Sequence, residues 1–139
     1  MNQIKYSGQV LEIKGYYKNY TINLGNFFPT SKTRIKKLVD IIFETETDID
    51  TASEYVDDIR GWLTQEITAL DDRSFNCDME ITKYHNLGKG NQVWIHLERF
   101  REREYKYLEK QIENLRNNRI SIGEEASKHG WTGTNEVTP

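Results

Sequence analysis

The sequence has few of the residues from which metal sites or covalent cross-links are built. Cys77 is the single cysteine, so an internal disulfide and a cysteine-based zinc site are both excluded. The three histidines, His85, His96 and His129, lack the HxxxH or HExxH spacing of a metal site. We therefore expect no metal and no cofactor, and one cysteine agrees with a reducing compartment.

Long apolar runs and a secretion signal are also missing. No apolar run approaches the roughly 18 residues of a membrane span, and the N-terminus MNQIKYSGQVLEIK lacks the basic-then-apolar order of a signal peptide. The 139 residues are 36% hydrophobic and 29% charged, with a mean hydropathy of -0.80. This length and composition predict one domain with a real core and a very polar surface, located in the cytoplasm and not bound to a membrane.

Catalytic signatures are absent as well. The chain contains no G-x-S-x-G, Walker or Rossmann glycine pattern. Asp78, Glu80 and Lys83 are similar to the acid, acid and lysine set of a metal-dependent nuclease, but one residue too many separates Glu80 from Lys83. On a strand, Lys83 would also point away from the two acids. We therefore expect a protein that is not an enzyme and has no catalytic residues.

Hydrophobic periodicity predicts three helices. The central one covers Asp50 to Asp72, where the apolar positions recur at helical spacing and form one buried stripe. These positions are Ala52, Tyr55, Val56, Ile59, Trp62, Leu63, Ile67 and Leu70. A shorter helix before it begins near Thr30 or Ser31, and a long one after it runs from about Glu98 to Asn118.

Two pairs of segments predict strands. Gln9–Ile13 and Tyr20–Leu24 are rich in β-branched and aromatic residues and predict a first hairpin. Apolar and polar residues alternate over residues 75–82 and again over 93–97, which predicts a second hairpin with its loop at residues 85–91.

These elements predict an α+β fold in the order ββααββα. A mostly antiparallel sheet of two hairpins is combined with two central helices and a long C-terminal helix. The expected single domain spans residues 1–122. Gly123 is expected to end the last helix, and residues 123–139 to form a flexible C-terminal tail.

Charge is strongly segregated along the chain. Residues 1–43 contain seven basic and two acidic side chains, residues 44–80 two and twelve, and residues 81–122 nine and five. The formal net charge of the whole chain is only -3. Blocks of one sign steer partners over about a Debye length, roughly 8 Å at physiological salt, so the segregation matters for association.

The acidic block predicts a partner-binding surface. Seven carboxylates lie between residues 44 and 58 without one basic residue, and they are Glu44, Glu46, Asp48, Asp50, Glu54, Asp57 and Asp58. Carboxylates repeated along a helix imitate the phosphate row of a nucleic acid and can occupy a basic groove on a partner. Gly61 costs an exposed helix about 1 kcal/mol relative to Ala, and close approach by a partner is one reason to keep it. The alternative is a solubilising surface that pairs with the basic ends of the chain.

The stretch EYVDDIRGWLTQE, in a small chain rich in Asn, Lys, Tyr and Ile, resembles the accessory proteins of phages and mobile elements in low-GC Gram-positive bacteria. Anti-CRISPR proteins are among these, and many of them block an effector nuclease by placing acidic side chains on its nucleic-acid-binding or PAM-reading surface. The resemblance implies a DNA-mimicking inhibitor in the host cytoplasm. It also implies that the seven carboxylates face lysines and arginines of a larger basic partner, such as a CRISPR effector nuclease.

The last predicted helix supports an alternative function as a nucleic-acid-binding module. Its basic residues recur at four-, three- and four-residue steps, and they are Arg99, Arg103, Lys106 and Lys110. Such a stripe is suitably spread for phosphates. An acidic stripe runs beside it, so ion pairs within a solvated helix explain the same residues.

The same helix could instead pair two copies of the chain. Its apolar side chains recur at three- and four-residue spacing, and they include Tyr105, Leu108, Ile112 and Leu115. A homodimer through the C-terminal helix is the third hypothesis, and Leu108→Glu would then yield monomers.

Overall fold

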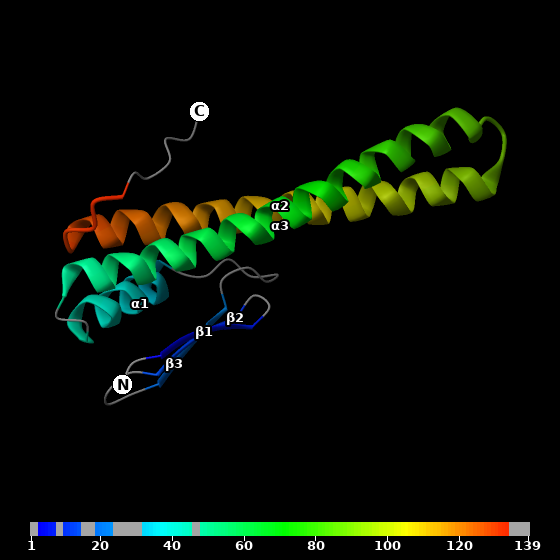
Figure 1. Ribbon diagram of the computed structural model, residues 1–139. Coiled ribbons are helices and arrows are strands. Elements are labelled where there is room, and N and C mark those ends of the chain that lie inside the picture. Colours follow the sequence, from blue (N-terminus) through cyan, green and yellow to red (C-terminus); the bar gives the residue numbers. More distant parts are fainter. Residues whose placement is uncertain (1–2, 8–9, 15–18, 24–31, 46–47, 134–139) are drawn as a thin grey trace. The chain divides into compact units, whose positions relative to one another are not determined.

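The computed structural model describes residues 3–7, 10–14, 19–23, 32–45 and 48–133. Three strands come first, β1 (Gln3–Ser7), β2 (Val10–Lys14) and β3 (Asn19–Asn23). Three helices follow, α1 (Lys32–Thr45), α2 (Ile49–Leu87) and α3 (Gln92–Lys128), and Figure 1 shows that α2 and α3 are much longer than α1. The order is therefore βββααα, and every element after residue 31 in the described chain is a helix.

The three strands form one antiparallel meander in the order β1-β2-β3. Ile4 lies opposite Ile13 between β1 and β2, and Leu11 lies opposite Ile22 between β2 and β3. The β2–β3 pair covers the segments for which a first hairpin is predicted. The strand β1 is not anticipated by the periodicity.

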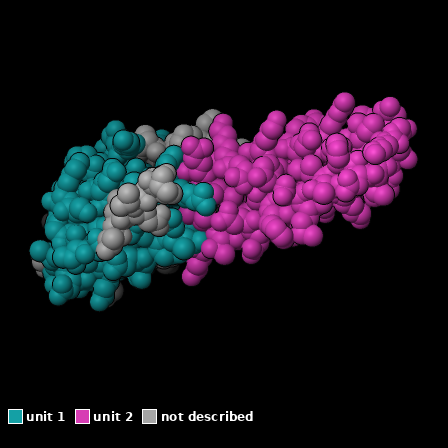
Figure 2. Space-filling view, turned by 90° about the horizontal axis from the view of Figure 1, so that it is seen from above, with its two compact units in different colours: residues 1–64, 114–139 teal, residues 65–113 magenta. Residues whose placement is uncertain are grey.

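The described residues divide into two compact units, coloured separately in Figure 2. Unit 1 comprises residues 1–64 and 114–139, and unit 2 comprises residues 65–113. The helices α2 and α3 each contribute to both units, because the boundary falls inside both helices.

The core of unit 1 is built from the predicted helical stripes. In the first part of α2, the predicted stripe is buried except at Tyr55 and Trp62, which are half-buried, and apolar residues of α1 and α3 join it. Among the described residues of unit 1, the buried apolar set is Ile35, Leu38, Val39, Ile41, Ile42, Ala52, Val56, Ile59, Leu63, Leu115, Ile122, Ala126 and Trp131. Fully burying one such aliphatic side chain contributes about 1.5–3 kcal/mol, so this core is the main source of stability in unit 1.

The predicted second hairpin is wrong, and with it the α+β fold in the order ββααββα. Residues 75–87 continue α2, and residues 93–97 form the start of α3. The side chains of α2 that face inward in unit 2 follow steps of four, three, four and three residues, and they are Leu70, Ser74, Cys77, Ile81 and Tyr84. That is the spacing of a helix, not of a strand.

The alternation over residues 75–82 misled because two inward positions are small or polar. Ser74 is buried and donates a hydrogen bond from Oγ to Oε1 of Glu109 at 2.7 Å, while Cys77 is buried as a free thiol. Phe75 and Met79, which the strand interpretation places inside, are 63% and 57% exposed. The buried positions therefore carry no strong apolar pattern in the sequence, and the two exposed apolar residues produce an alternation typical of a strand.

The predicted hairpin loop is instead the turn between α2 and α3. Gly90 has φ of +80°, a conformation that glycine adopts without strain. Asn91 then caps α3 by accepting a hydrogen bond from the Val93 amide on its Oδ1 at 3.0 Å. On either side of the turn, the rings of Tyr84 and Trp94 stack with their centroids 5.5 Å apart.

The helix α3 does not end at Gly123, as the sequence predicts, but continues to Lys128. Ser127 Oγ donates to the Gly123 carbonyl at 2.8 Å inside the helix. Gly130, with φ of +100°, follows the helix as a C-terminal glycine commonly does. Trp131, expected in the flexible tail, is 5% exposed. Residues 134–139 lie outside the described residues.

Candidate binding surfaces

Four of the predicted acidic residues lie on one side of α2 in unit 1. Asp50, Glu54, Asp57 and Asp58 recur at four-, three- and one-residue steps over the first turns of the helix, and all four are exposed. We call these four residues the acidic surface. The exposed Gly61 follows Asp57 by one turn, so it lies on the same side of the helix.

The other three predicted acids are placed differently. Glu44 is exposed in the last turn of α1, and Glu46 lies outside the described residues. Asp48 caps α2, because its Oδ1 accepts from the Asp50 amide at 3.2 Å and its Oδ2 from Thr51 Oγ1 at 3.0 Å. A carboxylate at this position stabilises the helix by about 1 kcal/mol, so Asp48 has a structural role.

The acidic surface is not neutralised by the chain itself in the part that the structure describes. Glu54 and Asp58 form no ion pair there, and the side chain of Asp50 forms none either. Two lysines in the described part of unit 1 pair with other carboxylates: Lys36 with Asp40, and Lys128 with Glu125. Pairing with the basic ends of the chain, the alternative left open by the sequence, is therefore not seen at these residues.

Asp57 differs from its neighbours because one of its oxygens is engaged. Its Oδ1 accepts a hydrogen bond from the Trp131 indole Nε1 at 2.9 Å. The guanidinium carbon of Arg60 lies 4.9 Å from the centre of the same indole, and Arg60 Nε donates to the Arg119 carbonyl at 3.3 Å. These contacts fix the α2 backbone beside the acidic surface against the end of α3.

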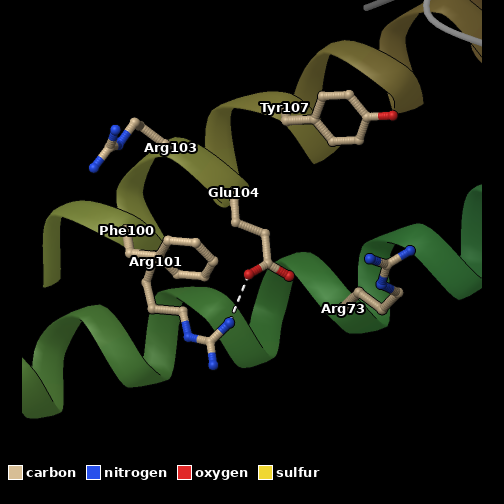
Figure 3. Close-up of a pocket in the computed structure, with 6 residues that line it drawn as sticks. All are labelled: Arg73, Phe100, Arg101, Arg103, Glu104 and Tyr107. Atoms are coloured by element: carbon tan, nitrogen blue, oxygen red, sulfur yellow. Dashed lines mark hydrogen bonds and ion pairs between the residues drawn. The ribbon is translucent and has the colours of Figure 1, made fainter. Parts of the chain in front are cut away.

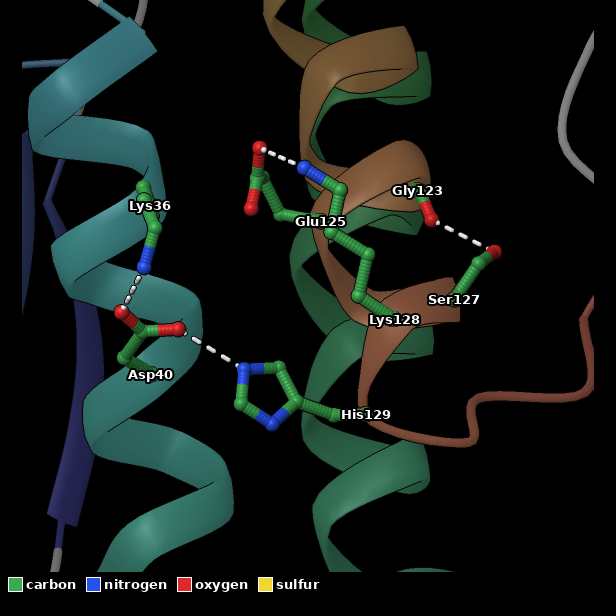
Figure 4. Close-up of polar contacts among 7 residues, drawn as sticks. All are labelled: Lys36, Asp40, Gly123, Glu125, Ser127, Lys128 and His129. Carbon is green, nitrogen blue, oxygen red and sulfur yellow. Dashed lines mark hydrogen bonds and ion pairs between the residues drawn. The ribbon is translucent and has the colours of Figure 1, made fainter.

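A second set of polar contacts joins α1 to the end of α3 (Figure 4). Asp40 accepts from Lys36 Nζ and from His129 Nε2, each at 2.7 Å, and the His129 ring stacks on Phe43 with centroids 4.9 Å apart. Burial raises the pKa of the Asp40 carboxyl, but the hydrogen bonds and charges of Lys36 and His129 together outweigh it. The pKa of Asp40 therefore lies below its usual value.

The four residues of the predicted basic stripe are exposed on α3 in unit 2. Arg99, Arg103, Lys106 and Lys110 form no ion pair among the described residues. Two of the four neighbouring glutamates are engaged elsewhere, because Glu98 accepts from His85 at 2.9 Å and Glu109 from Ser74. The other two, Glu102 and Glu113, are exposed and form no ion pair with the stripe among the described residues. No ion pair within α3 therefore engages these four cations in the described chain.

The apolar residues proposed for a homodimer seam are used within the chain. Leu108, Ile112 and Leu115 are 0%, 1% and 0% exposed, and Tyr105 is half-buried. They pack into the cores of their own units and leave no apolar face at these positions for a second copy.

A shallow hollow in unit 2 was not anticipated from the sequence. It has a volume of about 560 Å³ and is lined by Arg73, Phe100, Arg101, Arg103, Glu104 and Tyr107 (Figure 3). Arg101 donates from one terminal nitrogen to Glu104 at 2.6 Å and also pairs with Glu80. The sequence signal for this site is the seven-residue step from Phe100 to Tyr107, which places two large aromatics on one side of α3.

The described residues contain no group of three or more histidine, cysteine or acidic side chains that could hold a metal ion. His85 and His129 are engaged with Glu98 and Asp40, and His96 is exposed. None of the helices in the described chain has an apolar stretch of the length that a membrane crossing requires.

Protein-family models, curated proteins and solved structures contain no match to the chain. Two surfaces of opposite sign stand out, the acidic surface in unit 1 and the basic stripe with its neighbouring hollow in unit 2.

Proposed function

We propose that this protein is a non-enzymatic inhibitor from a phage or mobile element, acting in the cytoplasm of the host. Its acidic surface binds a larger basic protein that handles nucleic acid, such as a CRISPR effector nuclease, and competes with the nucleic acid there. The observation that carries the proposal is that Asp50, Glu54 and Asp58 are exposed on an ordered helix without a cation partner in the described chain.

The spacing of these carboxylates suits a basic groove. A helix rises 1.5 Å per residue, so Asp50 and Asp58 are separated by about 12 Å along the axis of α2. Exposed charges of one sign on a fixed scaffold accelerate association with an oppositely charged partner and disfavour wrong partners. The buried residues Val56 and Ile59 anchor this part of α2 in the core of unit 1, so the helix need not become ordered on binding.

The test is a pull-down from a lysate of a Gram-positive host, with and without nuclease treatment. The bait variant is Glu54→Lys with Asp58→Lys, because neither side chain has a polar partner within the described residues that the change would break. The matched control is Glu102→Lys with Glu113→Lys, which makes the same change in net charge at exposed positions of α3.

A protein partner that survives nuclease treatment, is retained by the control and is lost with the variant supports the proposal. Two results contradict it. One is a partner captured equally by the variant and the control. The other is recovery of nucleic acid alone, unaffected by the variant.

A further inference from the structure

Most of the exposed large hydrophobic residues in the described part of the chain lie in unit 2. Six of the seven large hydrophobic residues that are exposed in the described chain belong to unit 2, and these are Phe75, Met79, Leu87, Val93, Phe100 and Tyr107. Phe100 and Tyr107, at 56% and 40% exposed, both line the hollow. A single exposed aromatic residue is ordinary on a protein surface, but two that lie together indicate a site of interaction.

Two arginines without an ion-pair partner in the described chain line the hollow beside these two rings, and they are Arg73 of α2 and Arg103 of α3. The acidic lining residue, Glu104, is already engaged by Arg101 (Figure 3). The remaining cations of the basic stripe continue from Arg103 along the exposed side of α3, so the hollow opens beside a positive track.

This combination disfavours a second copy of the chain as the occupant. A two-fold interface places each surface against itself, so the arginines of one copy would face those of the other. Like charges without a counter-charge at an interface cost free energy. An anionic partner that also offers flat apolar faces satisfies both features of the site.

We propose that the hollow and the basic stripe bind single-stranded nucleic acid. Bases stack on the rings of Phe100 and Tyr107, and phosphates pair with Arg73, Arg103 and the stripe residues that follow. A single strand is required, because the bases of a duplex are paired and stacked inside it and cannot stack on the protein's exposed aromatic rings. This surface is distinct from the acidic surface in unit 1, so the failure of either proposal leaves the other standing.

The test is fluorescence anisotropy with a labelled 15-nucleotide deoxythymidine strand, titrated with the full chain at several salt concentrations. Phe100→Ala should weaken binding about 5- to 100-fold, as the loss of one stacked base does. Arg103→Ala should weaken binding and reduce the slope of log K against log salt by about 0.7, as the loss of one phosphate contact does on a single strand.

Two control variants match these changes outside the site. Met79→Ala removes an exposed apolar side chain of unit 2 that does not line the hollow, and Lys37→Ala removes an exposed cation of α1. Both should bind the strand like wild type. All four positions are exposed, so the variants should fold, and circular dichroism melts check this.

Four outcomes overturn the proposal. They are no binding of the strand at low salt, equal affinity of Phe100→Ala and Met79→Ala, equal competition by a duplex of the same length, and binding of a poly-glutamate peptide with the same dependence on Phe100. The last outcome would assign the surface to an acidic protein.

Discussion

The indole nitrogen of Trp131 donates a hydrogen bond to a carboxylate oxygen of Asp57 at 2.9 Å, joining the residue that follows the turn after α3 to the third turn of α2. Asp57 belongs to the acidic surface, and Trp131 belongs to the segment expected to be a flexible tail. The contact makes the end of the described chain part of the scaffold that holds the acidic surface.

This contact predicts an energetic coupling between the two residues. In a double-mutant cycle of Trp131→Phe and Asp57→Ala, we expect a coupling of about 1–2 kcal/mol, since the bond is partly buried and its acceptor is charged. Urea unfolding monitored by circular dichroism measures it. Glu54→Ala in place of Asp57→Ala is the control, and equal coupling in both cycles would contradict the contact.

The lowered pKa of Asp40 predicts that the protein loses unfolding free energy in acid. The stabilisation from the ionised form of Asp40 is complete above the unfolded pKa of about 3.9 and is lost as pH falls through the lower folded value. The difference in unfolding free energy between wild type and Asp40→Asn should therefore be largest near pH 7 and shrink below about pH 4. Urea titrations across this range provide the measurement.

Lys36→Ala serves as the control for this dependence. It removes one of the two donors to Asp40 and should reduce the acid-sensitive part of the difference. A difference between wild type and Asp40→Asn that does not vary between pH 7 and pH 3 would rule out this role of Asp40.

The thiol of Cys77 should react slowly in the folded protein. Burial raises its pKa, and the negative charge of Glu104 and the hydrogen bond with it add to the increase, so the reactive thiolate is scarce. Labelling with a chromogenic disulfide at pH 8 should be at least tenfold slower in buffer than in denaturant. A Cys77→Ala, Met79→Cys variant, with its thiol at a 57% exposed position, should label rapidly without denaturant.

A substitution at Leu108 tests whether this side chain stabilises the core of its own chain or an interface between two copies. Leu108→Ala should cost about 2–5 kcal/mol of unfolding free energy, because the side chain is completely buried within its own chain. Lys110→Ala, at an exposed position two residues further along α3, should change stability by less than about 0.5 kcal/mol. If Leu108→Ala instead turned a dimer into an equally stable monomer in light scattering, the homodimer through the C-terminal helix would be restored.

Substitution of Gly61 should affect the stability of the protein and its capture of a partner in opposite directions. A Cβ added there meets no atom within 4 Å, so Gly61→Ala should stabilise α2 by up to about 1 kcal/mol. The residue lies on the same side of α2 as Asp57, and we expect the added methyl group to weaken capture of the protein partner in the pull-down. Greater stability with unchanged capture would show that no partner approaches this position closely.

The sequence was sufficient wherever the buried side chains were large and apolar. The periodicity predicts the buried face in the first part of α2, because Ala52, Val56, Ile59 and Leu63 recur at helical spacing and all four are buried. Tyr55 and Trp62 of the same predicted stripe are half-buried. The exposure of the carboxylates and of the basic stripe followed from the same periodicity, since they occupy the opposite sides of their helices.

The sequence failed where an inward position was small or polar. Ser74 and Cys77 occupy buried positions of α2 but are small or polar, whereas Phe75 and Met79 are large, apolar and exposed. The apolar residues of this segment therefore alternate as in a strand, although the buried positions follow helical spacing. With residues 75–82 as a strand, nothing in the sequence places Phe100 and Tyr107 beside Arg73, because α2 and α3 bring these residues together only when both helices are continuous.

The sequence by itself therefore determined the segregation of charge and the helical periodicity, which depend on residue type and local spacing. The tertiary structure alone decided which charges remain free and which are engaged. Asp57 with Trp131, Asp40 with His129 and Arg101 with Glu80 are separated by 74, 89 and 21 positions in the chain. Pairings over such distances are set by how the helices pack, because local spacing carries no information about them.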